Sequence, residues 1–221
     1  MDNIIVFGTS QFSRMLCKYV ERECAAKIVA FTVNRDQFNK NDQSPEIEGY
    51  PIVEFEGIEN MFDPSEYKIL NTIGYSKMNE IRKIKNEECI KKGYELFSFI
   101  SKEARVLSKV KGYGNIILPG AFIGYDVSFG DSNIIYTGCT LTHDIEIGSN
   151  TFFASGCTVG GNVAIGNNCF FGMNSTLKNR IKIGNYSLVG AGTYINSDTK
   201  DYEVYVPANN KKLNKKSIQL L

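Results

Sequence analysis

The sequence predicts a protein of two parts, an α/β domain with a small parallel sheet followed by a parallel β-helix. Two observations carry this prediction. The N-terminal half alternates short apolar runs with helical patterns, and the C-terminal half repeats an apolar residue at every sixth position. A short fixed period means that a chain coils and stacks on itself, so the second part is expected to be one stack of coils.

Strands and helices alternate in the N-terminal half. The expected strands cover residues 3–8, 27–33, 51–55, 67–73 and 94–100, and the expected helices cover residues 11–24 and 77–92. The polar segment 34–48 is expected to be a loop. Alternation of this kind builds an open parallel sheet with helices on its faces. Such sheets bind ligands at the carboxyl ends of their strands.

The C-terminal half has a six-residue repeat of apolar side chains. Gly130, Gly148, Gly166 and Gly184 are eighteen residues apart, and two turn-forming residues follow each, so three repeats make one coil of a triangular prism. Gly and Asn suit the corners because they adopt positive φ at low cost. The fourteen apolar positions are Ile117, Ile123, Phe129, Ile135, Leu141, Ile147, Phe153, Val159, Ile165, Phe171, Leu177, Ile183, Val189 and Ile195.

The interior of such a prism is narrow, so large and small inward side chains have to share it. Ile135, Phe153 and Phe171 are expected to stack in one file at the strand spacing of about 4.8 Å. The position four residues after each apolar one is mostly small or β-branched. Cys139 and Cys157 occupy it one coil apart, where core packing is favoured over a disulfide or a metal site.

Composition excludes several classes of protein. A chain of 221 residues has room for two modest domains, and its net charge of +1 gives no electrostatic footprint for nucleic acid. No apolar run approaches the length of a membrane span, and the N-terminus has no signal-peptide pattern, so no membrane partner is expected. The six cysteines form no C-x-x-C pair. A reducing cytoplasm is the expected compartment.

The turn after the first expected strand occupies the place of a dinucleotide fingerprint without matching it. Of the three glycines in G-x-G-x-x-G only Gly8 is present, with Ser10 and Ser13 at the other positions, so a complete NAD site is not expected. The turn can still hold a phosphate on its amides and hydroxyls, or it is a tight turn with a serine cap. Gly8, Ser10 and Arg82 are the candidate residues for nucleotide binding near the strand ends.

The chain contains one histidine, His143, two residues after the apolar position Leu141 and directly before Asp144. The coil turns at this point, so the imidazole is expected to leave the prism. A lone histidine is usually a surface residue or a satisfied core residue. An imidazole oriented by a carboxylate, however, can take a proton from a hydroxyl or an amine. His143 and Asp144 are therefore the candidate catalytic residues.

Several segments carry a resemblance to a known family. They are His-Asp-Ile-Glu-Ile-Gly at 143–148, Ala-Ser-Gly-Cys at 154–157, Gly-Gly-Asn-Val-Ala-Ile-Gly at 160–166, Ile-Gly at 183–184, Val-Gly-Ala-Gly at 189–192, and the stretches 29–35 and 73–82. With them the chain resembles the sugar O-/N-acyltransferases, relatives of sialic acid O-acetyltransferase and of the UDP-4-amino-sugar and GDP-perosamine N-acetyltransferases. The resemblance implies a Rossmann-like nucleotide-sugar domain at 1–105 and a left-handed parallel β-helix at 106–221.

The resemblance also implies an activity and residue roles. The protein would transfer an acetyl group from acetyl-CoA, without a metal, to an amine or hydroxyl of a nucleotide-linked sugar in bacterial surface-polysaccharide biosynthesis. His143 would be the general base, Asp144 would orient it, and the N–H of Gly161 would stabilise the oxyanion. The pantetheine arm would lie between the prisms of a homotrimer, near Ala154, Asn162 and Asn179. Lys211 and Lys212 would reach the phosphates of CoA, or they belong to a solvated basic tail.

The chain departs from the family at three places. Relatives often have Gly-x-Gly-His-Gly where residues 9–13 stand here, which changes the expected nucleotide contacts. Many carry a second histidine at the position of Phe152, so a contact to the acetyl group or sugar is absent or replaced. Val206 stands where a glycine usually precedes the Pro-Ala pair.

Three alternatives stay open at this point. The chain could be a non-catalytic β-helix binding or scaffold protein, or an O-acetyltransferase acting on a sugar without a nucleotide. A zinc enzyme of the γ-carbonic-anhydrase type needs three histidine ligands, which one histidine cannot supply unless symmetry brings three copies together. The choice between N- and O-acetylation, the nucleotide carrier and the length of the acyl chain is also open.

Overall fold

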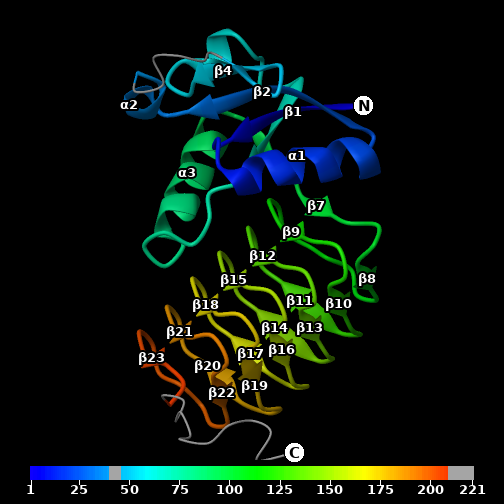
Figure 1. Ribbon diagram of the computed structural model, residues 1–221, viewed down its shortest axis with the longest axis vertical. Coiled ribbons are helices and arrows are strands. Elements are labelled where there is room, and N and C mark those ends of the chain that lie inside the picture. The colour runs from blue at the N-terminus through cyan, green and yellow to red at the C-terminus, as the bar shows by residue number, and fades with distance from the viewer. Residues whose placement is uncertain (40–45, 209–221) are drawn as a thin grey trace, which may run out of the picture.

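The structure is a computed structural model that describes residues 1–39 and 46–208, and it has two parts (Figure 1). In chain order, the elements of the N-terminal part are β1 (Asp2–Phe7), α1 (Gln11–Glu23), β2 (Ala26–Val33), α2 (Arg35–Phe38), β3 (Glu46–Ile47), β4 (Tyr50–Glu54), the 3₁₀ helix η1 (Ile58–Asn60), β5 (Tyr67–Asn71), α3 (Glu80–Lys91) and β6 (Glu95–Leu96). The expected α/β pattern is confirmed.

The strands of the N-terminal part form one sheet in the order β3-β4-β2-β1-β5-β6. All neighbours are parallel except β3 and β4, which form a short antiparallel pair. Residues of α3 and η1 cover one face of the sheet around Ile5 and Ile69. Leu16 and Val20 of α1 cover the other face, and α1 in turn packs on the second part of the chain. The parallel sheet is therefore buried on both sides, as such sheets normally are.

The second part is a left-handed β-helix whose strands stack into three sheets. One sheet has the order β22-β19-β16-β13-β10-β8, one β11-β14-β17-β20, and one β23-β21-β18-β15-β12-β9-β7. The strands are β7 (Phe99–Ile100), β8 (Arg105–Val106), β9 (Ile116–Ile117), β10 (Phe122–Ile123), β11 (Val127–Phe129), β12 (Ile134–Ile135), β13 (Thr140–Leu141), β14 (Ile145–Ile147), β15 (Phe152–Phe153), β16 (Thr158–Val159), β17 (Ala164–Ile165), β18 (Phe170–Phe171), β19 (Thr176–Leu177), β20 (Lys182–Ile183), β21 (Leu188–Val189), β22 (Tyr194–Ile195) and β23 (Val204–Tyr205).

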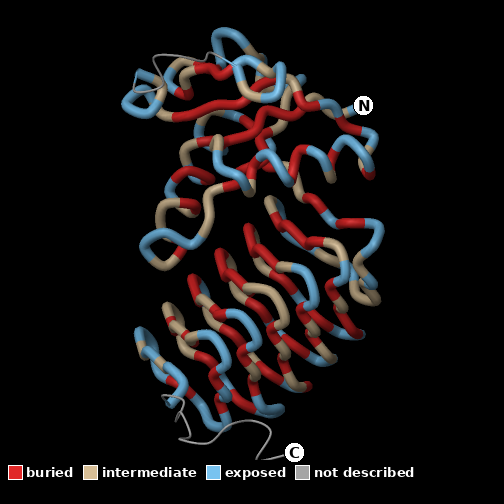
Figure 2. Tube along the Cα trace, in the orientation of Figure 1, coloured by how far each residue is buried: buried red, intermediate tan, exposed pale blue. Residues whose placement is uncertain are grey.

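The register of the coils is the predicted one. Ile135 pairs with Phe153, and Phe153 pairs with Phe171, eighteen residues further on. The rings of the two phenylalanines stack with their centroids 4.8 Å apart, which is the strand spacing. Figure 2 shows the buried residues of successive coils repeating along the prism. Cys139 and Cys157 are buried inside it, and their thiols donate to backbone carbonyls.

Positive φ at the corners falls on the second residue after each glycine, which includes two of the expected asparagines, and not on the glycine itself. In the corner that follows Gly148 and its equivalents, the left-handed residues are Ser132, Asn150, Asn168 and Tyr186, with φ between 56° and 60°. Gly148 itself is not left-handed. A Cβ on Gly148 would lie 2.8 Å from the backbone of Gly166 in the next coil. Glycine is needed there because the coils approach closely, and not because of φ.

Two expectations about single elements were wrong. Residues 94–100 are two strands, since Phe97 donates its N–H to Ile69 of the first sheet whereas Phe99 donates to Asn115 of the prism. The chain thus passes from one sheet to the other within three residues. The segment 34–48 is not wholly a loop, because it contains α2 and β3. Among the described residues, no helix is long and apolar enough to cross a lipid bilayer.

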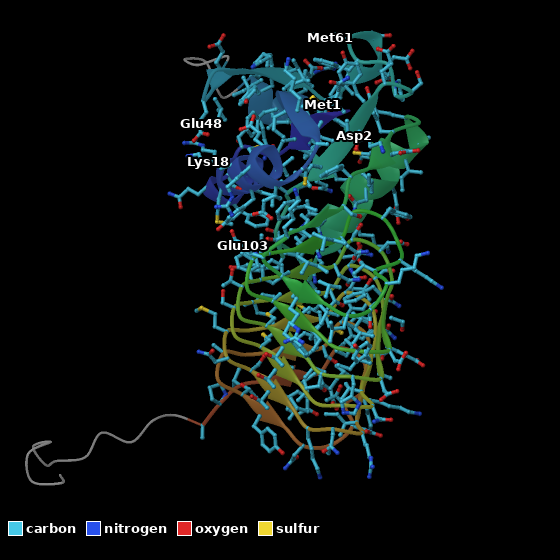
Figure 3. The ribbon with its side chains drawn as sticks, turned by 90° about the vertical axis from the view of Figure 1, so that its right-hand side faces the viewer. Met1, Asp2, Lys18, Glu48, Met61 and Glu103 are labelled. Atoms are coloured by element: carbon cyan, nitrogen blue, oxygen red, sulfur yellow. The ribbon has the colours of Figure 1, made fainter. Side chains whose placement is uncertain are left out.

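The two parts are joined by polar contacts as well as by apolar packing. Glu23 at the end of α1 accepts hydrogen bonds from the Ser101 hydroxyl and the Lys102 N–H, both at 2.8 Å. Arg22 forms an ion pair with Glu103, which lies at the junction of the two parts in Figure 3. These contacts hold α1 against the first coil.

Candidate active site

His143 and Asp144 form the turn between β13 and β14. Asp144 has a φ of 52°, and the residues at the equivalent turn of the neighbouring coils, Asp126, Asn162 and Arg180, are left-handed as well. We call this edge of the prism, residues 125–126, 143–144, 161–162 and 179–180, the histidine corner. Asp and Asn adopt the left-handed conformation more readily than most residues, which explains their presence here.

The side chains of His143 and Asp144 are in contact. The Nδ1 atom of His143 lies 2.7 Å from Oδ2 of Asp144, and both side chains are more than half exposed. With Nδ1–H donating to the carboxylate, Nε2 carries a lone pair and faces away from it. This is the tautomer that can accept a proton from a substrate.

Gly161 lies directly against the imidazole. A Cβ on Gly161 would be 2.5 Å from Nε2 and 2.9 Å from Nδ1 of His143, so no side chain fits there while the ring keeps its place. Among the described residues, the N–H of Gly161 donates no hydrogen bond. The N–H groups of residues 125, 143 and 179, at the equivalent position of the other turns, also donate no hydrogen bond among the described residues. Gly161 differs from them because it has no side chain and the ring of His143 lies against its backbone.

The predicted CoA-binding residues fall at two different corners. Asn162 donates its N–H to the carbonyl of His143 (3.1 Å), and Asn179 belongs to the next turn of the histidine corner. Ala154 follows β15 at a different corner, and it packs on the cluster shared with the N-terminal part. One copy of the chain therefore does not bring Ala154 to His143. Lys211 and Lys212 lie outside the described residues.

The turn at Gly8 and Ser10 is a capped helix start. Gly8 has a φ of 108°, and a Cβ there would be 2.9 Å from the Thr72 hydroxyl. Ser10 is the N-cap of α1, and Ser10 and Ser13 accept from each other's backbone N–H in a capping box. The N–H groups of Gln11 and Phe12, in the first turn of α1, donate to no group among the described residues.

Arg82 does not fit its expected role in substrate binding, because it is 1% exposed. Its guanidinium donates to the carbonyls of Gly74 (2.6 Å), Asn150 (3.0 Å) and Ser132 (3.2 Å). Burial lowers the pKa of Arg82 to about 9. Arg82 thus ties α3 to the loop after β5 and to two coils of the prism. The burial of Arg82 could not be predicted from the sequence, because Arg82 is one of several charged residues in the expected amphipathic helix 77–92.

A cluster of aromatic side chains that was not predicted from the sequence lies where the N-terminal part meets the prism. It comprises Phe12, Tyr75, Tyr136, Phe152 and Phe170. A signal was available, since the residue before each inward position in one of the three sheets is apolar. Among residues 1–39 and 46–208, no group of three His, Cys, Asp or Glu side chains could hold a metal ion.

Together these features define a class of protein, in which a small α/β domain is joined to a left-handed β-helix of hexapeptide repeats. Residues 162–197 match the family described as bacterial transferase hexapeptide (six repeats). No curated protein sequence matches the chain significantly.

Several solved structures share this fold over nearly the whole chain. The acetyltransferase domain of PglB from Neisseria gonorrhoeae matches with a TM-score of 0.82 and 22% identity, over 96% of this chain and 100% of that one. A mutant of perosamine N-acetyltransferase from Caulobacter crescentus, in complex with CoA and GDP-perosamine, matches with 0.82 and 22%, over 94% of each chain. WeeI from Acinetobacter baumannii matches with 0.73 and 17%, over 94% of this chain and 97% of that one. The repeats and these likenesses confirm the predicted fold, an α/β domain followed by a left-handed β-helix of hexapeptide repeats.

Proposed function

We propose that the protein transfers an acetyl group from acetyl-CoA to an amine or hydroxyl of a nucleotide-linked sugar, as a step in the synthesis of bacterial surface polysaccharides. The observation that carries the proposal is the contact between His143 and Asp144 above the bare backbone of Gly161. The structural likeness supports it, because the PglB domain has been solved with acetyl coenzyme A and the perosamine enzyme with CoA and GDP-perosamine.

In the proposed reaction the acceptor attacks the thioester carbon of acetyl-CoA directly. Nε2 of His143 takes the proton that the acceptor loses, and Asp144 stabilises the imidazolium. The N–H of Gly161 donates to the carbonyl oxygen as it becomes negative. When the C–S bond breaks, His143 returns its proton to the sulfur of CoA. The base ends neutral, and the products are the acetylated sugar and free CoA.

An acyl-enzyme is not part of the proposal. The thiols of Cys139 and Cys157 are buried in the prism and donate to backbone carbonyls, so neither reaches the histidine corner. The hydrogen bond with Cys157, followed by burial, raises the pKa of the Cys139 thiol, which disfavours the thiolate of Cys139. Mixing the enzyme with acetyl-CoA alone is therefore expected to leave its intact mass unchanged.

The proposed site is completed by a second copy of the chain. The histidine corner joins the sheets of β13 and β14, whereas α1 packs on the third sheet, which contains β12 and β15. The body of the prism therefore separates His143 from the N-terminal part of its own chain. In the proposed homotrimer, residues 1–105 of one copy would present the nucleotide sugar to His143 of its neighbour. Asn162, Asn179 and a neighbour's Ala154 would line the groove for CoA.

Gly8 and the first turn of α1 would hold the nucleotide phosphates through backbone N–H groups, with Ser10 keeping the turn in shape. Arg82 takes no part in binding. The cytoplasm is the proposed compartment, which agrees with the six unbridged cysteines.

A coupled assay tests the proposal. Purified protein is incubated with acetyl-CoA and a panel of UDP-, GDP- and dTDP-linked amino sugars and neutral sugars, and products are detected by mass spectrometry. We expect one acceptor to gain an acetyl group while CoA is released in equal amount. A protein that binds acetyl-CoA and transfers to none of them would support the scaffold alternative.

A further inference from the structure

We infer that Tyr75 and Phe170, supported by Phe152 and Tyr136, form a stacking subsite for the sugar ring of the acceptor. We call these four residues the aromatic platform. The inference rests on the proposed function, since it assigns the sugar half of the same substrate.

The platform is built from outward side chains of the prism and from one loop of the N-terminal part. Phe152 and Phe170 belong to adjacent coils, and their rings stack at 5.6 Å with an interplanar angle of 17°. The Tyr75 ring contacts both, at 5.0 Å and 4.8 Å between centroids. Phe152 is 4% exposed and forms the floor, whereas Tyr75 is 56% exposed and Phe170 is half-buried.

The platform lies just beyond the carboxyl ends of β1 and β5. Tyr75 follows β5 by four residues, and Phe12 in the first turn of α1 stacks on Tyr136 at 5.3 Å. This edge of a parallel sheet is where ligands bind. The unpaired N–H groups of Gln11 and Phe12 open at the same place. A diphosphate held there would carry its sugar toward the platform.

The loop that delivers Tyr75 is held in a costly conformation. Lys77, Met78 and Asn79 are all left-handed, with φ of 49°, 52° and 66°. Non-glycine residues are strained in this region and persist there where surrounding contacts enforce the conformation. The contacts here are the bond from Arg82 to the Gly74 carbonyl and those of Asn79 and Asn168, which tie the loop to the prism. A loop fixed at this cost keeps Tyr75 over the two phenylalanines.

The chemistry of the platform suits a pyranose ring. The two phenylalanine rings can neither donate nor accept a conventional hydrogen bond, and burying a polar group without one is unfavourable. They therefore favour contact with the C–H face of a sugar ring over contact with a charged group or with hydroxyl groups. Among the described residues, the hydroxyls of Tyr75 and Tyr136 have no hydrogen-bond partner, and the rings that carry them both contact Phe152. Two polar groups beside an apolar floor can fix the orientation of a ligand.

Binding measurements on full-length variants test the subsite. We expect Tyr75→Ala to weaken binding of the nucleotide sugars by about 3- to 10-fold, since one aromatic contact contributes roughly that much. The free nucleoside diphosphates UDP, GDP and dTDP should bind as tightly as before, and the affinity for CoA should not change. Tyr194→Ala is the matched control, because Tyr194 is 59% exposed on another sheet of the prism.

A fluorescence titration gives an independent measurement. The chain has no tryptophan, so Phe170→Trp places a single reporter in the platform and keeps an aromatic ring. Its emission should respond to nucleotide sugars more strongly than to the free diphosphates, and Phe122→Trp on another sheet should not respond.

The outcomes separate this inference from the proposed function. If the wild-type protein transfers acetyl groups but Tyr75→Ala binds nucleotide sugars normally, the platform is not the sugar subsite. If Tyr75→Ala weakens the free diphosphates equally, the platform holds the nucleotide instead, and the inference is also overturned. If no transfer occurs yet the tryptophan responds to the sugar moiety, the subsite stands and the proposed reaction fails.

Discussion

Replacing Gly161 by alanine should separate catalysis from folding. The backbone of Gly161 is not left-handed, so alanine fits its conformation, but the new methyl group would lie 2.5 Å from Nε2 of His143. An ordinary contact begins at about 3.4 Å, and the imidazole therefore has to retreat by about 1 Å. Because the His143 side chain is 58% exposed, it can swing toward solvent at little cost in stability.

Retreat of the ring removes the proposed base from its position beside the Gly161 N–H and strains the 2.7 Å contact with Asp144. A misplacement of about 1 Å can lower a rate by about 100-fold. We therefore expect Gly161→Ala to reduce kcat by about 100-fold while Tm stays within about 2 °C of the wild type. The assay is steady-state acetyl transfer to the acceptor found in the panel, together with thermal unfolding of the same samples.

Gly172→Ala is the matched control. Its methyl group would also meet an atom at 2.5 Å, but that atom is the backbone nitrogen of Ala191 in the next coil, which cannot swing away. Overpacking of this kind typically costs 1–3 kcal/mol, so Tm should fall by about 5 °C. The reasoning is refuted if Gly161→Ala retains wild-type turnover, or if it unfolds as early as Gly172→Ala.

Three further predictions concern Asp144, Arg82 and the tyrosines Tyr94 and Tyr136. Asp144→Asn keeps the left-handed turn and should lower kcat less than removal of His143 does, because it mis-orients the ring without deleting it; an equal loss would give Asp144 a different role. Arg82→Met should lower the free energy of unfolding in urea by about 2–4 kcal/mol, because buried carbonyls lose their donor. Glu87→Ala on the exposed side of α3 should change it by under about 0.5 kcal/mol, and equal effects of the two substitutions would contradict the role of Arg82 in joining α3 to the prism. Burial raises the pKa of Tyr94 and of Tyr136 to about 12, so stability present below pH 10 should be lost as pH rises from about 10 to 12; a flat urea midpoint across that range would count against their burial.

The prism could be predicted from the sequence because its information is local. Each repeat places one side chain inward, and the eighteen-residue coil then sets the strand register, as the Phe153–Phe171 pair shows. The positions of His143, Asp144 and Gly161 follow from the same arithmetic. The exact left-handed residue at each corner does not, because the close approach of the coils requires the glycine at Gly148 whereas positive φ falls two positions later, at Asn150.

What the sequence did not reveal depends on contacts between the two parts. Nothing local distinguishes Arg82 from the exposed charges of α3, yet it is buried against the prism. Residues 94–100 are split because β6 is the edge strand of the N-terminal sheet and β7 is the edge strand of the prism sheet that contains β12 and β15. One usable signal was present. The outward residues Ile134 and Phe152 are apolar in one sheet of the prism, whereas the outward residues Thr140 and Thr158 are polar in another. This difference indicates that the sheet of Ile134 and Phe152 is covered.

The packing of α1 also determines how the domains can be tested. It covers Ile116, Ile134 and Phe152 of the prism. Removing residues 1–100 would expose these side chains to water, and a large exposed apolar patch invites association. Point variants of the full chain are therefore the better test of the proposed nucleotide-sugar role of residues 1–105.

The most direct test of the central claim is chemical rescue of His143→Ala. Removing the proposed base should lower kcat by about 10²–10⁴-fold, with the affinity for CoA unchanged. Because the His143 side chain is exposed, free imidazole can enter the vacated position. We predict that added imidazole restores part of the turnover of His143→Ala in a saturable manner and has no such effect on the wild type. Turnover of His143→Ala close to that of the wild type, without imidazole, would contradict the account.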